Sequence, residues 1–209
     1  MTMNSFETDL KRAFFSVNFL AGLLIECFIL WRSGFQSEMF RISVPVLSSL
    51  PYTTAWLGDY KSGYIKAYLP RSGTASYILG KFLSCGISGG ALLVLACMAI
   101  PAGEEGDREG KLFLIFLSGM FWAVVSATLA AAAKSRYVAY GGAFVLFYVL
   151  VILYERYFKG WYCLYPVEWY APEHTWVLGD IGIIWMLTGM IVVIGILYYE
   201  ILRRCIENV

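Results

Sequence analysis

The chain alternates long apolar runs with short polar segments. A helix needs about 17 to 25 mostly apolar residues to cross a hydrocarbon core of roughly 30 Å. A run at 137–153 is short, but it has no charged residue, and tyrosines near both ends suit the membrane interface. Together with four plainer runs it predicts five membrane-spanning helices. The plainer runs are 14–31, 77–100, 112–133 and 181–199.

A sixth run, Ile42 to Leu57, reads ISVPVLSSLPYTTAWL and contains Pro45 and Pro51. Proline removes a backbone donor and bends or breaks a helix. Membrane helices tolerate it when neighbouring groups satisfy the freed carbonyls. The segment therefore crosses the membrane as a kinked helix or only dips into it, and the pattern leaves both possibilities open.

The first residues predict a helix of another kind. The predicted helix covers residues 3–13. Three apolar side chains of this segment and the one at position 14 fall on one helical face. Such a face favours a short elbow helix that lies on the inner membrane surface before the chain turns into the first span. The alternative is a plain N-terminal extension of that span. The four side chains are Phe6, Leu10, Ala13 and Phe14.

Composition supports a membrane protein. Apolar residues make up 59% of the chain and charged residues only 15%, which is too much apolar surface for one soluble domain to hide. The net charge of +1 gives no reason to expect a nucleic-acid partner. No small-residue cleavage site follows the first apolar run, so we interpret this run as a retained span of a multi-pass protein.

The positive charges predict the orientation. With six spans and both termini in the cytoplasm, ten of the sixteen Lys and Arg residues lie inside. A five-span arrangement with the N-terminus outside gives the same count, and both arrangements place residues 59–81 in the cytoplasm. The inner residues are Lys11, Arg12, Lys61, Lys66, Arg71, Lys81, Lys134, Arg136, Arg203 and Arg204.

Residues Trp56 to Phe82 form an unusually polar and basic segment for this chain. Between Tyr60 and Leu69 aromatic and basic residues alternate, and a helix there can place Tyr60, Tyr64 and Tyr68 on one side. Such a ridge could fit a groove on a soluble partner. The same basic residues could instead contact anionic lipid headgroups.

Taken together, these segments resemble the membrane subunit of a bacterial ATP-binding cassette type-2 exporter. The resemblance covers nearly the whole chain as topology and is specific at residue level only around 45–90. In that family the loop that couples to the ATPase is marked by an acidic residue, a Gly four positions later and an Arg. A Tyr and then a Lys lead from this loop into the third span. The corresponding residues are Asp59, Gly63, Arg71, Tyr77 and Lys81.

The resemblance implies an all-α transmembrane domain over 1–209. It would contain an elbow helix, six spans, a coupling loop at 59–76 and a re-entrant or interfacial external segment at 154–178. It also implies that Asp59 caps the coupling helix or accepts a hydrogen bond from the ATPase, and that Gly63 permits close backbone approach. Arg71 and Lys81 would anchor the return into the third span at lipid headgroups.

The expected partners are an ATPase subunit, a second permease copy or a different permease, and membrane lipid. No G-x-x-x-x-G-K-[ST] motif occurs in the chain, so ATP and Mg²⁺ would be bound by the partner and no cofactor by this chain. The Gly86-x-x-x-Gly90 pattern predicts close approach of another helix, and Gly182 and Gly189 offer similar faces for subunit pairing. The cargo is not identified; lipids, peptides and antibiotics fit this architecture equally.

Two further features carry candidate chemistry. Glu26 lies within the first span, where a carboxylate is costly unless it is paired or faces water. It therefore lines a substrate path, contacts another helix, or reaches the outer interface. Segment 154–176 has nine Trp, Tyr or Phe residues, which suits the outer interface. It also contains the only histidine, His174, so a histidine metal cluster is not expected.

Two other classes of protein were weighed against the exporter. A substrate-capture subunit of a vitamin-type importer has a similar length and number of spans, but it has less need of a coupling loop. An intramembrane protease could use Glu104 and Glu105, yet these residues fall in a hydrophilic turn with no second histidine available. The sequence therefore favours a transporter subunit that is not itself an enzyme.

Overall fold

Helices make up every regular element in the part of the chain that the structure describes. The structure is a computed structural model, and it describes residues 3–65, 69, 73–100, 108–176 and 178–207. The elements are α1 (Met3–Phe14), α2 (Val17–Ser33), α3 (Glu38–Leu47), α4 (Ala55–Lys61), α6 (Thr74–Ala99), α7 (Arg108–Ala133), α8 (Arg136–Arg156), the short 3₁₀ helices η1 (Tyr162–Leu164) and η2 (Pro166–Trp169), and α9 (Asp180–Glu207).

Four of these helices, α6, α7, α8 and α9, are long and apolar enough to cross a membrane. A fifth crossing is possible if α1 and α2 are taken together as one bent span. The predicted all-helical architecture is therefore confirmed for the described residues, and several of its helices have the length and composition of membrane spans. With 17 residues, α2 is at the lower limit of length for crossing alone.

Helices α1 and α2 are separate elements. Their axes differ by 48°, and the break between them contains Ser16. Ser16 has an extended backbone, and its hydroxyl accepts a hydrogen bond from the Phe19 amide at 3.1 Å, which caps the N-terminus of α2. The N-terminal residues thus form a distinct helix and not a straight extension of the first span.

The proline-containing run does not form one continuous helix. Helix α3 ends at Leu47, the chain turns through 48–54, and α4 begins at Ala55. Hydroxyl groups add hydrogen bonds to backbone carbonyls in this stretch: Ser49 donates to Val46 at 2.6 Å, and Thr53 donates to Ser49. The run at 42–57, for which the sequence left a kinked span and a shallow dip open, thus consists of two short helices joined by turns.

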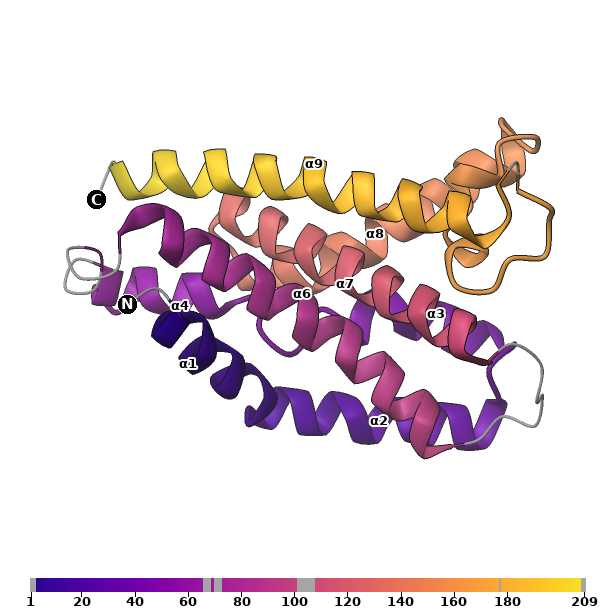
Figure 1. The fold of residues 1–209 in the computed structure, drawn as a ribbon, viewed down its shortest axis with the longest axis horizontal. Helices are drawn as coiled ribbons and strands as arrows, with labels where there is room; N and C mark the ends of the chain where they lie inside the picture. Colours follow the sequence, from indigo (N-terminus) through magenta and orange to yellow (C-terminus); the bar gives the residue numbers. More distant parts are fainter. Residues whose placement is uncertain (1–2, 66–68, 70–72, 101–107, 177, 208–209) are drawn as a thin grey trace.

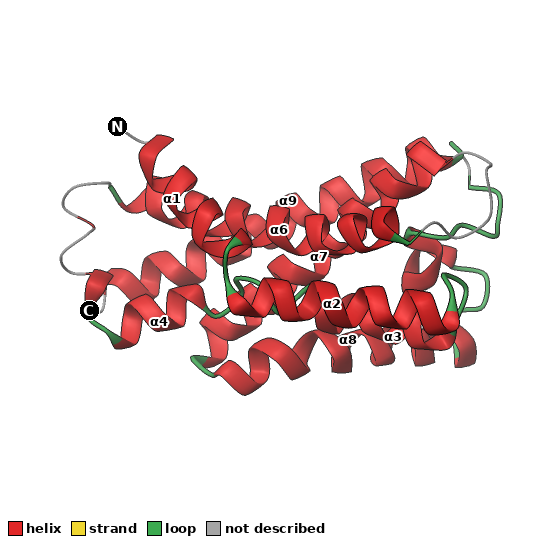
Figure 2. Ribbon diagram, turned by 90° about the horizontal axis from the view of Figure 1, so that it is seen from below, coloured by secondary structure: helices red, strands yellow, loops and turns green. Residues whose placement is uncertain are grey.

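The helices lie roughly along one long axis (Figure 1). Helix α1, helix α4 and the C-terminal part of α9 lie at one end, which we call the terminal end. The aromatic segment, residues 154–178, lies at the other end. Figure 2 shows the same arrangement from below, with α1, α6 and α9 in the upper part of the picture and α2, α3 and α8 in the lower part.

The centre of the bundle is the close contact between α6 and α7. A side chain at Gly89 would collide with the Cβ of Ala123 and would lie 2.6 Å from the Ser48 carbonyl oxygen. At Gly90 the nearest backbone atom is the Phe116 carbonyl oxygen, also at 2.6 Å. The small residues predicted to admit another helix thus admit α7 of the same chain.

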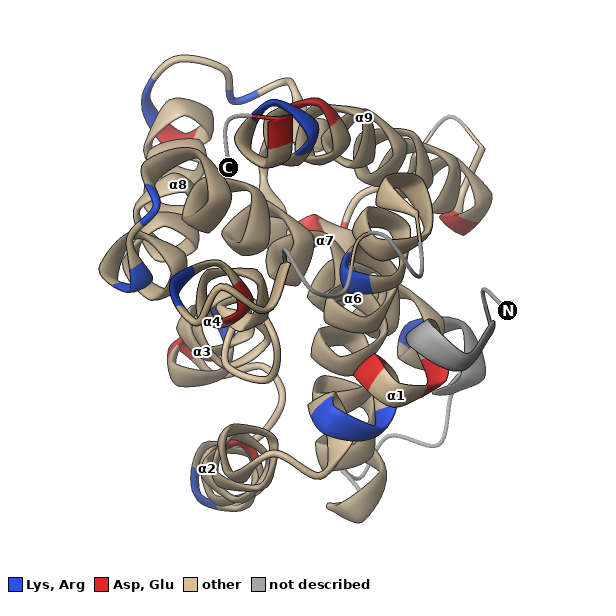
Figure 3. Cartoon of the chain, turned by 90° about the vertical axis from the view of Figure 1, so that its left-hand side faces the viewer, with Lys and Arg blue, Asp and Glu red and all other residues tan. Residues whose placement is uncertain are grey.

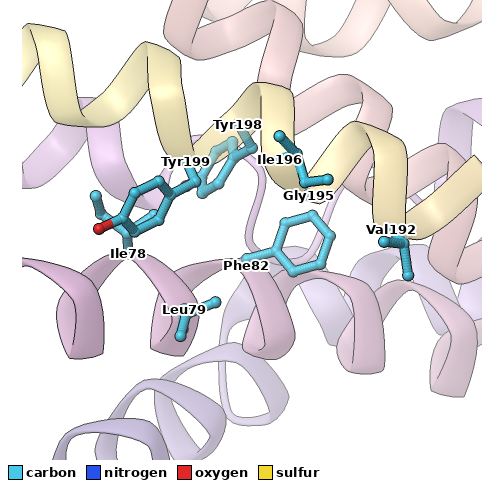
Figure 4. A pocket seen from close by; sticks show the side chains of 8 residues that line it. All are labelled: Ile78, Leu79, Phe82, Val192, Gly195, Ile196, Tyr198 and Tyr199. Carbon is cyan, nitrogen blue, oxygen red and sulfur yellow. The ribbon is translucent and has the colours of Figure 1, made fainter.

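A shallow apolar groove of about 300 Å³ separates α6 from α9 near the terminal end (Figure 4). The ring of Phe82 points from α6 toward α9, where Gly195 leaves room for it: a Cβ there would lie 3.1 Å from the ring. Trp185 and Val193 of α9 are exposed, so α9 presents an apolar outer face. The groove is lined by Ile78, Leu79, Phe82, Val192, Gly195, Ile196, Tyr198 and Tyr199.

The aromatic segment packs across the far end of the bundle through η2. The Trp169 ring is buried and stacks on Trp122 of α7, with centroids 5.8 Å apart, and meets Phe121 edge-on at 5.1 Å. Tyr170 packs edge-on against Phe40 of α3 at 5.7 Å. The segment predicted to be interfacial or re-entrant therefore contains short 3₁₀ turns whose aromatic rings contact α3 and α7.

Candidate functional site

A buried lysine joins three elements at the terminal end. The side chain of Lys81, in the second turn of α6, is only 3% exposed. Its Nζ lies 2.9 Å from Asp9 Oδ1 of α1 and 2.9 Å from Asp59 Oδ2 of α4. One ammonium group therefore bridges two carboxylates from helices that are separate in the sequence.

Two tyrosine hydroxyls complete the network. Tyr52 donates to Asp9 Oδ1 at 2.6 Å and accepts from Lys81 Nζ at 3.0 Å, while Tyr77 donates to Asp59 Oδ2 at 2.9 Å. We call Asp9, Tyr52, Asp59, Tyr77 and Lys81 the Lys81 cluster. A buried ion pair is stable only when further hydrogen bonds satisfy its polar atoms, and the two hydroxyls do this here.

Helical spacing brings these side chains together. Tyr77 and Lys81 are four residues apart on α6 and so share one face. Asp9 is four residues before the fully buried Ala13, on the face of α1 that packs on α6. Figure 3 shows that acidic positions on α1 and α4 and a basic position on α6 gather at this end.

The position of Lys81 corrects the prediction of a headgroup anchor. The side chain does not extend to the surface because two carboxylates hold it inside the bundle. Asp59 likewise lies inside α4 and does not cap a helix, and its carboxylate is bound by Tyr77 and Lys81 of the same chain. Arg71 lies outside the described residues.

The predicted tyrosine ridge is only partly present. Tyr60 stacks on Trp56 with centroids 5.2 Å apart, and Lys134 Nζ lies 5.3 Å from the Tyr60 ring centre. Because α4 ends at Lys61, Tyr60 and Tyr64 do not share one helix, and Tyr64 is exposed. Tyr68 and Lys66 lie outside the described residues.

Within the described part of the predicted coupling loop, the short stretch 61–64 consists entirely of exposed residues. Gly63 has a φ of +71°, a left-handed conformation that glycine adopts without strain, and a Cβ there would meet nothing within 4 Å. We call residues 61–64 the exposed turn. It begins at Lys61, the last residue of α4 and two residues after Asp59, so the end of α4 connects it to the Lys81 cluster.

Glu26 lies apart from the Lys81 cluster. It is fully buried in α2, and Oε1 is 3.0 Å from the Ser43 hydroxyl of α3. The carboxyl group therefore contacts another helix and does not reach the outer interface. Of the alternatives raised by the sequence, a contact between helices is the one that this geometry shows.

A third polar group lies in the aromatic segment, where the sequence had drawn attention to the rings and to His174 but not to Glu168. Glu168 is buried and accepts hydrogen bonds from the amides of Glu173 and His174 and contacts His174 Nδ1 at 2.7 Å. The His174 ring also stacks on Tyr162, with centroids 4.0 Å apart. Glu168 thus closes the turn after η2, which is a structural role.

The described residues offer no metal centre, since no three His, Cys, Asp or Glu side chains among them gather closely enough to hold an ion. Glu104 and Glu105, weighed for a protease, lie outside the described residues. Comparisons with known protein families, with curated proteins and with solved structures found no match for this chain. The Lys81 cluster and the exposed turn are therefore interpreted from their own geometry.

Proposed function

We propose that this chain is the permease subunit of an ATP-driven exporter in a bacterial plasma membrane. Helix α2, the broken α3–α4 segment and helices α6 to α9 would form six passes. The terminal end, with the exposed turn, would then face the cytoplasm. Energy would come from a separate ATPase subunit, and the cargo would be a lipid, a peptide or an antibiotic.

The observation that carries this proposal is the double ion pair of Lys81. A coupling element has to pass a displacement from a soluble partner to a membrane helix, and this requires a stiff connection. Lys81 joins α4, next to the exposed turn, to α6, which is one of the membrane-spanning candidates, and to α1. Movement of the exposed turn would therefore act on α6 through charged, buried contacts and not through a flexible loop.

Assembly would involve two permease subunits and two ATPase domains. Gly86 and Gly90 are not available for this pairing because α7 occupies their face. The outer face of α9 fits better: a side chain at Gly189 would meet nothing within 4 Å, and Trp185 is exposed. Small residues of this kind allow helices of two subunits to approach closely in a membrane.

Replacing Tyr64 with Asp tests the proposed contact with the ATPase. We expect an ATPase to copurify with the wild-type chain in mild detergent from its own cells. The Tyr64→Asp variant should retain no more than about a tenth of that ATPase. An aromatic side chain in a partner contact often contributes enough binding energy for such a loss. The amount of ATPase per permease is measured by quantitative mass spectrometry.

Tyr157→Asp is the matched control, because Tyr157 is an exposed tyrosine at the opposite end of the bundle, directly after α8. It should retain the ATPase at the wild-type level. A wild-type chain that purifies without any ATPase would contradict the proposed class of protein. Equal retention by Tyr64→Asp and wild type would contradict the role of the exposed turn.

A further inference from the structure

Glu26 and Tyr170 each bury a polar atom that has no hydrogen-bond partner among the described residues. Glu26 is 0% exposed and Tyr170 1%, and the atoms concerned are Glu26 Oε2 and the Tyr170 hydroxyl. The Tyr170 ring packs on Phe40 of α3. The Ser43 hydroxyl links this residue to Glu26, because it lies near both the Phe40 carbonyl oxygen and the Glu26 carboxyl. In native proteins such unpaired groups often mark a bound water, ion or ligand.

The one donor near Glu26 cannot serve it fully. The Ser43 hydroxyl lies 3.0 Å from Glu26 Oε1 and 2.8 Å from the Phe40 carbonyl oxygen. A hydroxyl has a single proton, so it can donate to only one of these acceptors at a time. When Ser43 donates to Phe40, the carboxyl of Glu26 receives no hydrogen bond from the described residues.

No cation of the described chain is within ion-pair distance of Glu26. Arg41, on the same helix as Ser43, pairs with Glu38 at 3.1 Å and lies 4.0 Å from Glu173. Lys81 is held by its own two carboxylates. A buried carboxylate without a countercharge is strongly unfavourable in a membrane, so the Glu26 carboxyl either takes up a proton or binds a positively charged group.

An apolar groove of about 280 Å³ lies between α2 and α3, and Ser43 is the polar residue of its wall. Glu26 does not line the groove; its carboxyl lies behind Ser43, with Oε1 3.0 Å from the Ser43 hydroxyl. Met39 is largely exposed, so the groove opens toward the outer surface of the helices. Its lining residues are Ile29, Met39, Ile42, Ser43, Val46 and Leu47.

We propose that the α2–α3 groove and Glu26 bind an amphipathic molecule that carries a protonated primary amine. Its apolar chain would lie along the groove, and its ammonium group would donate to Glu26 and to the oxygen of Ser43. An ammonium has three donors and no acceptor, which matches a carboxylate with one unpaired oxygen beside a hydroxyl. The interpretation of this groove as a cargo site rests on the proposed export function. The binding of the amine does not depend on that function.

Binding of radiolabelled dodecylamine to the full chain in phosphatidylcholine nanodiscs tests the proposal. We expect saturable binding above that of empty nanodiscs, and at least about tenfold weaker binding to Glu26→Gln, because the charge-assisted hydrogen bonds are lost. Glu38→Gln is the control: it makes the same change in net charge at an exposed position of α3 and should bind as wild type does. Dodecanol, which lacks the charge, should not distinguish wild type from Glu26→Gln.

A second variant tests the groove without altering the carboxyl group. Val46→Trp would fill the groove and should also weaken dodecylamine binding. Equal binding to wild type and Glu26→Gln, or the absence of saturable binding to wild type, would overturn the proposal and leave water as the occupant. The binding measurement involves no ATPase, so a negative result would not contradict the proposed export function. Conversely, a chain that purifies without an ATPase would not contradict the proposed amine binding.

Discussion

Replacing Lys81 with Met should destabilise the protein by about 3 to 5 kcal/mol, the effect of breaking a buried ion pair from one side. Asp9 and Asp59 would then keep their burial and lose the ammonium group that both share. Against a total stability of about 5 to 15 kcal/mol, this loss is large. Thermal unfolding in detergent, followed by tryptophan fluorescence, should show a much lower transition or no folded protein.

Two controls distinguish the loss of pairing from the loss of a lysine. Lys61→Met removes an exposed lysine at the end of α4 and should unfold within a few degrees of wild type. The uncharged variant Asp9→Asn/Asp59→Asn/Lys81→Met removes all three charges and should recover most of the stability, because uncharged replacements avoid the desolvation of ions. An unchanged transition for Lys81→Met alone would contradict the buried pairing.

The second large effect concerns the contact between α6 and α7. Gly89→Leu should destabilise the bundle by about 3 kcal/mol, in the upper range for an overpacked core. The new side chain would collide with the Cβ of Ala123 on α7, and it would start 2.6 Å from the carbonyl oxygen of Ser48, which follows α3. Both are fixed by the backbone and cannot rotate away. Unfolding in a mixed-micelle titration with dodecyl sulfate would measure the difference.

Gly141→Leu provides the matched control for this prediction. It makes the same substitution within α8, where a side chain meets nothing within 4 Å. Both variants gain helix propensity equally, so the difference between them isolates the packing effect. Equal stability of the two variants would show that α6 and α7 are not in close contact.

The sequence predicted the helices well because their signal is local. A run of apolar residues predicts a helix in a membrane whatever the rest of the chain does. Glycines spaced four apart predicted close helix packing for the same reason. Which helix packs against these glycines is not encoded locally in the sequence. Gly86 and Gly90 could have faced another subunit, and only the fold shows that they face α7.

The Lys81 cluster could not be predicted because its members are far apart in the chain. Asp9 and Lys81 are separated by 72 positions, and a lysine near the start of a span usually extends to the interface. One local signal was present: Asp9 lies three residues after Phe6 and four before Ala13, on the apolar face of α1. An acidic residue on such a face indicates a buried partner.

The central claim is that the Lys81 cluster transmits the movement of a bound ATPase to α6. Spin labels at Leu79→Cys on α6 and Tyr137→Cys on α8, in a background without native cysteines, would report the distance between these helices in the complex with the ATPase. We expect vanadate trapping of the ATPase to change this distance in the otherwise unaltered chain. The uncharged variant should retain and trap the ATPase with little change in distance; the same distance change in both proteins would contradict the account.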